Sequence, residues 1–210
     1  MEGHGEQEAV LNLLYRVEAQ IGTAGAVWAP PIRVRQLSTS DGLERLCNRV
    51  RLDAEAAGLL ILRDEDDGCP ATIGPDVATF LRGQRLPFPA AVVLAHREFE
   101  SLFLASMKSI VGRPLPGPGG HARPGWPENA IFLGNPESKR GAKEWLSAQL
   151  PRGRKYKPSV DQLPLMQMVD LDLVRESGLA WFGTLERALR FLTKNAGTSG
   201  AVYPPPATHG

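Results

Sequence analysis

The sequence has few cysteines and no long apolar run. Cys47 and Cys69 are the only cysteines among 210 residues, and they lie far apart without a second pair. This count argues against a disulfide framework and against a zinc site, and it favours a reducing compartment. No apolar stretch approaches the length of a transmembrane helix, and residues 1–6 do not begin a secretory signal. We therefore expect a cytoplasmic protein without a membrane partner.

A surplus of charge of either sign is also missing. The chain has 24 Lys+Arg and 23 Asp+Glu, which gives a formal net charge of +1. Such a balance creates no global field that would attract nucleic acid or an anionic membrane. Any nucleic-acid contact must therefore come from a local basic patch.

Helical and extended patterns alternate through the first 95 residues. Apolar residues at helical spacing predict helices over 6–20 and 40–50, the second capped by Ser40. Two unbroken apolar runs, over 58–62 and 90–95, are typical of strands that are covered on both faces of a parallel sheet. Between them, Pro75 predicts the first turn of a helix that ends near Arg82. This order predicts an α/β fold, a Rossmann-like, mostly parallel sheet with flanking helices.

The second half of the chain follows a different pattern. One more helix is predicted over 99–111, and the Gly- and Pro-rich residues that follow it predict a loop. Later helices are predicted over 138–150, 160–175 and 185–192. The final residues include Pro204-Pro205-Pro206 and have little to bury, which predicts a disordered tail. We thus expect an α/β domain over 1–111, a loop over 112–127, a C-terminal helical subdomain over 128–195 and a tail over 196–210.

Acidic residues follow both apolar runs. Asp64 and Asp66 come directly after the first run, and Glu98 and Glu100 come after the second. Because the carboxyl ends of parallel strands meet at one edge of a sheet, these carboxylates should lie close together. Carboxylates this close repel one another unless a cation lies between them, and Mg²⁺ or Mn²⁺ prefers such oxygen ligands. Helix capping or an Asp-rich turn explains either pair alone, but their joint placement favours a metal site.

The spacing of the second acidic pair sets a condition on this hypothesis. Two residues that are two apart on a helix point to nearly opposite sides. Glu98 and Glu100 can therefore share a site only if at least one of them precedes the helix.

One short stretch concentrates basic residues and contains an aromatic ring. Its candidates for contact with nucleic acid are Arg152, Arg154, Lys155 and Tyr156, whose ring could stack on a base or a sugar. Lys157 or Lys155 could also stabilise charge near a scissile phosphate. A solvated linker between helices is an equally good interpretation of this stretch.

The acidic motifs resemble those of Toprim domains, which place a Glu after the first strand, Asp-x-Asp after a later strand and further acids after the next. Glu2, with Gly3 and then Glu6, resembles the first motif, and Asp64-Glu65-Asp66 resembles the second. Glu98-Phe99-Glu100 resembles the Glu-x-Glu of overcoming-lysogenisation-defect (OLD) nucleases. Together these motifs span residues 1 to about 105.

A closer resemblance is to a Toprim-like family of small bacterial proteins, a domain of unknown function. Its members are often encoded beside an ABC-type or AAA-type ATPase, and a role in defence against phage is suspected. The stretches that carry this resemblance are Glu2-Gly3-His4-Gly5-Glu6, the acidic turn that ends at Cys69-Pro70, Ala95-His96-Arg97-Glu98-Phe99-Glu100 and Lys155-Tyr156-Lys157.

The resemblance implies hydrolysis of phosphodiesters with two metal ions, Mg²⁺ or Mn²⁺. Glu2, Asp64 and Asp66 would hold one ion, and Glu6, Glu98 and Glu100 would hold or orient the second. Glu2, Asp64, Asp66 and Lys157 would be the catalytic residues. The implied partners are DNA or RNA and a separate ABC/AAA-type ATPase.

The resemblance also implies a strand before Glu2, and only Met1 precedes that residue here. We therefore expect the first strand to be missing from this chain, with the start of the natural protein upstream. Two alternatives to a nuclease stay open. One is an inactive Toprim-like module that binds or regulates, and the other is a metal-dependent phosphatase or phosphotransferase acting on small molecules.

Overall fold

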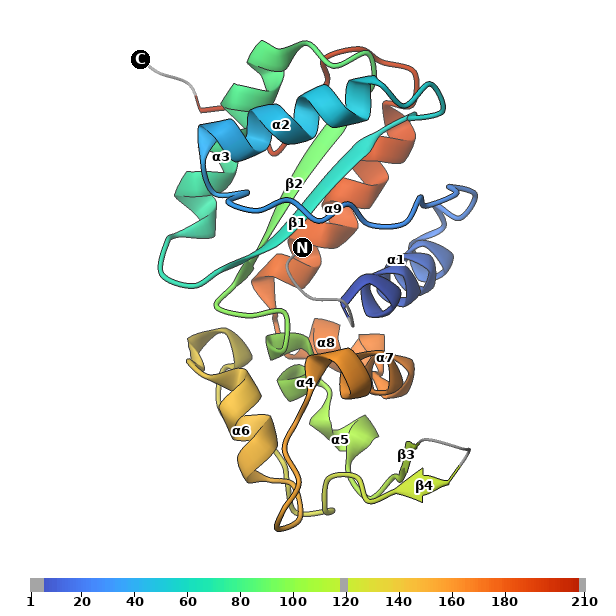
Figure 1. Cartoon of the computed structure of the whole chain (residues 1–210), viewed down its shortest axis with the longest axis vertical. Helices are drawn as coiled ribbons and strands as arrows, with labels where there is room; N and C mark the ends of the chain where they lie inside the picture. Colours follow the sequence, from blue (N-terminus) through green and yellow to red (C-terminus); the bar gives the residue numbers. More distant parts are fainter. Residues whose placement is uncertain (1–5, 118–120, 208–210) are drawn as a thin grey trace.

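The centre of the structure is a small parallel sheet. The computed structural model describes residues 6–117 and 121–207. Its strands β1 (Leu59–Glu65), β2 (Ala90–His96) and β5 (Val202–Tyr203) are ordered β1-β2-β5. In the long pairing, Leu59 lies opposite Ala90 and Glu65 lies opposite His96. The predicted α/β class with a mostly parallel sheet is confirmed (Figure 1).

Helices cover both faces of this sheet. Figure 1 shows α2 (Ser40–Arg51) and α3 (Pro70–Gln84) in front of the strands and α9 (Ala180–Lys194) behind them. Alternate residues of each strand point to opposite faces, so each strand needs apolar side chains in both directions. Ile61 and Val92 pack with α2 and α3, whereas Leu62 and Val93 pack on the other side. This two-sided burial explains the unbroken apolar runs.

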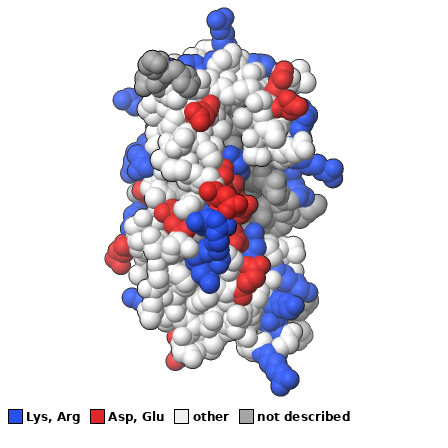
Figure 2. Space-filling model, turned by 90° about the vertical axis from the view of Figure 1, so that its left-hand side faces the viewer, with Lys and Arg blue, Asp and Glu red and all other residues white. Residues whose placement is uncertain are grey.

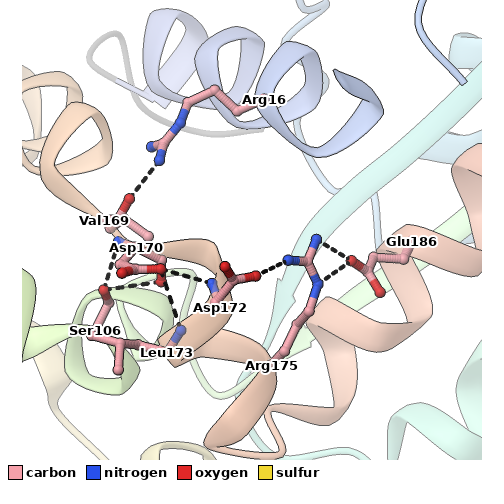
Figure 3. Close-up of polar contacts among 8 residues, drawn as sticks. All are labelled: Arg16, Ser106, Val169, Asp170, Asp172, Leu173, Arg175 and Glu186. Atoms are coloured by element: carbon pink, nitrogen blue, oxygen red, sulfur yellow. Dashed lines mark hydrogen bonds and ion pairs between the residues drawn. The ribbon is translucent and has the colours of Figure 1, made fainter. Parts of the chain in front are cut away.

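The helix α1 (Glu6–Ile21) lies on the same side of the sheet as α9. Its apolar stripe is completely or almost completely buried, and Leu13 and Val17 are both 0 % exposed. Arg16 on its polar side donates hydrogen bonds to the carbonyl oxygens of Met166 and Val169. Figure 3 shows the second of these bonds, which ties α1 to the helices below the sheet.

The helix α3 begins earlier than the sequence analysis predicts. Pro70 is in its first turn and Pro75 lies inside it, so the predicted start at Pro75 is wrong. Pro at the start of a helix costs no hydrogen bond, because a backbone N–H at that position would have no partner within the helix. Pro75, inside the helix, removes one backbone hydrogen bond. The Pro75 carbonyl still accepts a bond from Thr79 Oγ1 at 2.9 Å. The helix α2 also begins differently, because Thr39 rather than Ser40 is its cap and accepts from Gly42 N.

Short helices replace the long ones predicted in the second half. They are α4 (Ser101–Ala105), α5 (Met107–Ile110), α6 (Ala142–Ala148), α7 (Pro158–Met168) and α8 (Leu171–Glu176). Asp170 separates α7 from α8, and its carboxylate accepts from the N–H of Asp172 at 2.9 Å. Its own N–H donates to Ser106 Oγ at 2.8 Å. The Asp170 side chain thus caps the start of α8 (Figure 3).

Two parts of the second half join the rest of the molecule more closely than predicted. The tail is not disordered at residues 202 and 203, because Val202 pairs with Ala90 and Tyr203 with Ala91. The Gly- and Pro-rich loop contains a two-stranded antiparallel pairing of β3 (Leu115–Pro116) and β4 (Ala122–Arg123). The division into an α/β domain and a helical subdomain stays a prediction, although α9 packs directly on β2. Within the described ranges, no helix is both long and apolar enough to cross a membrane.

Candidate metal centre

The acidic residues lie where β1 and β2 end. Asp64 lies next to the last residue of β1, Glu98 follows β2 in an irregular turn, and Glu100 immediately precedes α4. The condition set by the spacing of Glu98 and Glu100 is therefore met, because Glu98 precedes the helix. The two strand ends deliver three carboxylates to one edge of the sheet.

Three carboxylate oxygens face the same ammonium group. The Nζ atom of Lys143 in α6 lies 3.5 Å from Glu100 Oε2 and 3.6 Å from Glu98 Oε2. Asp64 Oδ2 lies 4.0 Å from the same atom. Three negative charges around one positive charge leave the group with a net negative charge. We call this cluster the acidic site (Asp64, Glu98, Glu100 and Lys143). Its centre is a position that suits a cation.

Backbone groups fix the carboxylates in this orientation. Asp64 Oδ1 accepts from the N–H of Phe99 at 2.8 Å, and Glu98 Oε1 accepts from the N–H of Ala142 at 3.2 Å. Each bond occupies one oxygen and turns the other toward Lys143. The acidic site is therefore preorganised by the turn after β2 and by the first turn of α6.

Glu100 is the most buried member of the acidic site, with 1 % of its surface exposed. Its Oε1 accepts from the hydroxyl of Tyr156 at 3.0 Å. Its Oε2 has no hydrogen-bond partner among the described residues, and the same holds for Glu98 Oε2. Burial raises the pKa of Glu100 to about 7, because the Lys143 ammonium and the Tyr156 bond offset only part of the lost hydration, while Asp64 raises it further.

Arg97 holds the two acidic loops together in an unusual backbone conformation. Its φ angle is 67°, in the left-handed region that residues other than glycine rarely adopt. Its N–H donates to Glu65 O at 2.8 Å, and its guanidinium donates to Asp66 O at 2.6 Å. Strained residues of this kind cluster at functional sites. Arg97 thereby fixes the turn that carries Asp66 next to the turn that carries Glu98.

Charged side chains surround this edge of the molecule. Figure 2 shows acidic and basic groups gathered near the middle of one face. Asp67, in the loop after β1, accepts from Arg140 at 2.6 Å and lies 3.7 Å from Arg97. The Arg140 guanidinium lowers the pKa of Asp67. The pair of Asp67 and Arg140 is exposed, with 77 % and 64 % of these side chains accessible.

A hollow of about 450 Å³ opens at the acidic site. Asp64, Glu98 and Lys143 line it, and so does the exposed Asp66. In the described part of the chain, no three Asp, Glu, His or Cys side chains are grouped closely enough to hold a metal ion as they stand. The donor set is nevertheless the one that Mg²⁺ and Mn²⁺ prefer, and two of its buried oxygens lack hydrogen bonds. The chemistry fits a hard cation, and the ammonium of Lys143 lies between the ligands.

A larger hollow, of about 590 Å³, lies between the first turns of α3 and α9. Its lining is mostly apolar, and its polar groups bond to one another: Arg187 donates to the Tyr203 hydroxyl at 2.9 Å, and Glu137 accepts from Trp181 N at 3.1 Å. The Cys69 thiol in its wall has a lowered pKa, chiefly through the backbone N–H of Ala71. Asp67 and Glu137 also line this hollow, but each accepts a hydrogen bond, from Arg140 and from Trp181 N respectively. The smaller hollow, where buried carboxylate oxygens have no donor among the described residues, is the better candidate for chemistry.

The structure brings together only some of the residues that the sequence analysis singled out. Asp64, Glu98 and Glu100 meet, and Asp66 lies at the rim of their hollow. Glu2 and the side chain of Glu6 lie outside the described residues. Their predicted role as metal ligands therefore stays a prediction.

The basic stretch divides into buried and exposed members. The ring of Tyr156 is 6 % exposed and so lies inside the core, where it cannot stack on a base. Arg154 is bound to Asp161 at 3.0 Å and lies over the ring of Trp126. Arg152, Lys155 and Lys157 are exposed and stay available for a phosphate contact.

The sequence analysis missed Lys143, the cation of the acidic site. It assigned the catalytic lysine to Lys157, an exposed residue whose backbone N–H donates to Asp161 Oδ2 at 2.8 Å. Lys143 lies far from both acidic motifs in the sequence, and its neighbours form an ordinary amphipathic helix. Only the tertiary fold, which places α6 against the turn after β2, brings it to the carboxylates.

Comparisons with known proteins give no relative. No protein-family model matches the chain, and neither the curated proteins nor the solved structures contain a match. The residues of the acidic site therefore provide the evidence about function.

Proposed function

We propose that this chain is a Mg²⁺- or Mn²⁺-dependent nuclease or nicking subunit with a Toprim-like site. The observation that carries the proposal is the convergence of Asp64, Glu98 and Glu100 at the ends of two parallel strands. Buried carboxylates with unbonded oxygens are costly, and proteins keep them where they bind a cation or react. The resemblance of the acidic motifs to Toprim domains supports the same interpretation.

The acidic site offers the ligands that this chemistry needs. Asp64, Glu98 and Glu100 would hold a divalent ion, with Asp66 at the rim as a further ligand. A bound ion would activate water and neutralise charge on the phosphate. Tyr156 orients Glu100, and Arg97 holds the loop of Asp66 in place.

The surroundings of Tyr156 support a polymeric substrate. Its hydroxyl touches Glu100, while its neighbours Lys155 and Lys157 are exposed. Two exposed lysines therefore flank, along the chain, the residue that reaches the acidic site. DNA or RNA would gain phosphate contacts from them. The resemblance also suggests a separate ABC/AAA-type ATPase as a partner and a role in defence against phage.

Cleavage of supercoiled plasmid DNA and of single-stranded RNA, with Mg²⁺ or Mn²⁺, tests the proposal. We expect cleavage that EDTA abolishes and that Asp64→Asn lowers by at least about 100-fold, since a ligand is lost. Asp76→Asn is the matched control, because Asp76 is an exposed acid on α3 away from the hollow. Cleavage that survives in Asp64→Asn would contradict the assigned site.

The position of Lys143 favours one alternative, a module that binds nucleic acid or an ATPase without cutting. Its ammonium offsets part of the negative charge of the carboxylates, so the acidic site depends less on a metal ion. Under this alternative, Asp64→Asn binds labelled DNA or RNA as tightly as the natural chain does, and neither protein cuts it. Metal-dependent cutting by the natural chain, but not by Asp64→Asn, would exclude this alternative.

A further inference from the structure

The acidic site contains its own cation. Lys143 Nζ lies within 4.0 Å of one oxygen from each of Asp64, Glu98 and Glu100. The Glu98 and Glu100 oxygens are buried and accept no hydrogen bond within the described ranges, so the nearby ammonium offsets their charge. A divalent ion bound by these oxygens would have to lie where the ammonium now lies.

We propose that Lys143 and a divalent cation occupy the acidic site in alternation, so that Lys143 sets the metal affinity as an internal competitor. This inference rests on the proposed function, because it assumes that the carboxylates bind metal. Two positive charges crowded among the same oxygens would repel each other, so entry of the ion expels the ammonium. Metal binding is therefore an exchange of cations, and it becomes weaker than the carboxylates alone would allow.

The way in which α6 is anchored shows what moves during this exchange. Leu146 is 0 % exposed, and its carbonyl accepts from Trp126 Nε1 at 2.8 Å. The helix is thus fixed in the core, and Ala142 N is bonded to Glu98. The Lys143 side chain is 36 % exposed and has a flexible four-carbon stem. It can therefore turn toward the solvent while the helix stays in place.

The affinity of the full chain for Mn²⁺, measured by titration calorimetry, tests the exchange. Lys143→Met keeps the stem and removes the charge, so we expect it to bind Mn²⁺ at least tenfold more tightly than the natural chain. Lys194→Met is the matched control, since Lys194 is an exposed lysine in the last turn of α9. Its affinity should stay within twofold of the natural value.

A second measurement uses the natural chain and does not depend on the folding of a variant. Brief acylation with an N-hydroxysuccinimide ester, followed by peptide mass spectrometry, reports how accessible each lysine amine is. Addition of Mn²⁺ should accelerate acylation of Lys143 and leave that of Lys194 unchanged. An unchanged rate at Lys143, at a Mn²⁺ concentration that saturates the protein, would overturn the exchange.

The results separate this inference from the proposed function. Equal or weaker Mn²⁺ binding by Lys143→Met, with binding lost in Asp64→Asn, would overturn the competitor and keep the metal site. Absence of Mn²⁺ binding in both the natural chain and Lys143→Met would overturn the metal site itself. Tighter binding by Lys143→Met that Asp64→Asn abolishes in the same background supports both.

Discussion

Two carboxylates are equally buried in this protein but differ in how they are compensated. Asp161 and Glu100 each have side chains that are 1 % exposed. Asp161 lies 3.1 Å from the Arg123 guanidinium and 3.0 Å from that of Arg154, and it also accepts from the N–H of Lys157 at 2.8 Å. Glu100 has the Tyr156 hydroxyl and a shared ammonium at 3.5 Å. Asp161 is saturated with donors, whereas Glu100 is not.

This difference separates a structural ion cluster from a candidate site. Asp161, which is saturated with donors, joins β4 and the basic stretch to α7. It has no capacity left for a ligand. An undersaturated carboxylate keeps an oxygen for a proton or a metal ion, at a cost in stability. Burial alone does not distinguish a saturated from an undersaturated carboxylate, because the difference lies in the number of donors around it.

Loss of Asp161 should have the largest effect on stability. Asp161→Ala leaves Arg123 and Arg154 without their shared partner, and breaking a buried pair costs about 4 kcal/mol. Urea denaturation measures this loss. The control Asp172→Ala removes an acid that is 73 % exposed and should cost far less. Equal effects of the two substitutions would contradict the comparison.

The pH dependence of stability should reveal Glu100. Its pKa of about 7 lies above the ordinary 4.5, so the folded protein keeps this proton to higher pH than the unfolded chain does. The resulting stability is full below pH 4.5 and is lost as the pH rises through 7, by about 3 kcal/mol at about 1.4 kcal/mol per unit.

Urea denaturation in EDTA at pH 5 and pH 8 measures this loss. Glu100→Gln cannot titrate, so over this pH interval its stability should fall by about 2.5 kcal/mol less than that of the natural chain. Glu8→Gln, which removes an exposed acid on α1, should retain the full fall. If the free energy of unfolding changes with pH in the same way for the natural chain and for Glu100→Gln, Glu100 titrates normally.

The hydroxyl of Tyr156 should contribute a smaller amount. Tyr156→Phe keeps the buried ring and removes the donor to Glu100, which should cost about 1 kcal/mol at pH 5 and more at pH 8, where Glu100 is ionised. Chemical denaturation at both pH values measures the two costs. Tyr15→Phe, at a ring that is 46 % exposed, is the control and should show no such dependence on pH.

The smallest effect should come from the exposed pair of Arg140 and Asp67. Their side chains are 64 % and 77 % exposed, and water and salt screen such charges. Arg140→Ala should leave the urea midpoint unchanged, in low salt and in 0.5 M NaCl alike. A clear shift of the midpoint would show that the loop after β1 depends on this pair.

The sequence predicts the strands β1 and β2 but not β5, and it predicts the acidic site in part. Unbroken apolar runs locate β1 and β2, because two-sided burial leaves a local pattern in the sequence. The carboxylates after each run are local to the strands, so parallel pairing brings them together. Lys143 and Tyr156 reach the site from distant helices and turns, and no local pattern marks such contacts. The split at Asp170 and the pairing of Val202 depend likewise on partners far along the chain.

The pairing of β5 has a consequence for the order in which the protein can fold. During synthesis β2 emerges long before α9 and β5, which cover its face and its edge. An uncovered apolar strand with a free edge can pair with other chains. The nascent chain therefore carries an aggregation-prone strand until residues 180–203 leave the ribosome, and a product that stalls before them would meet chaperones or proteases before the sheet is complete.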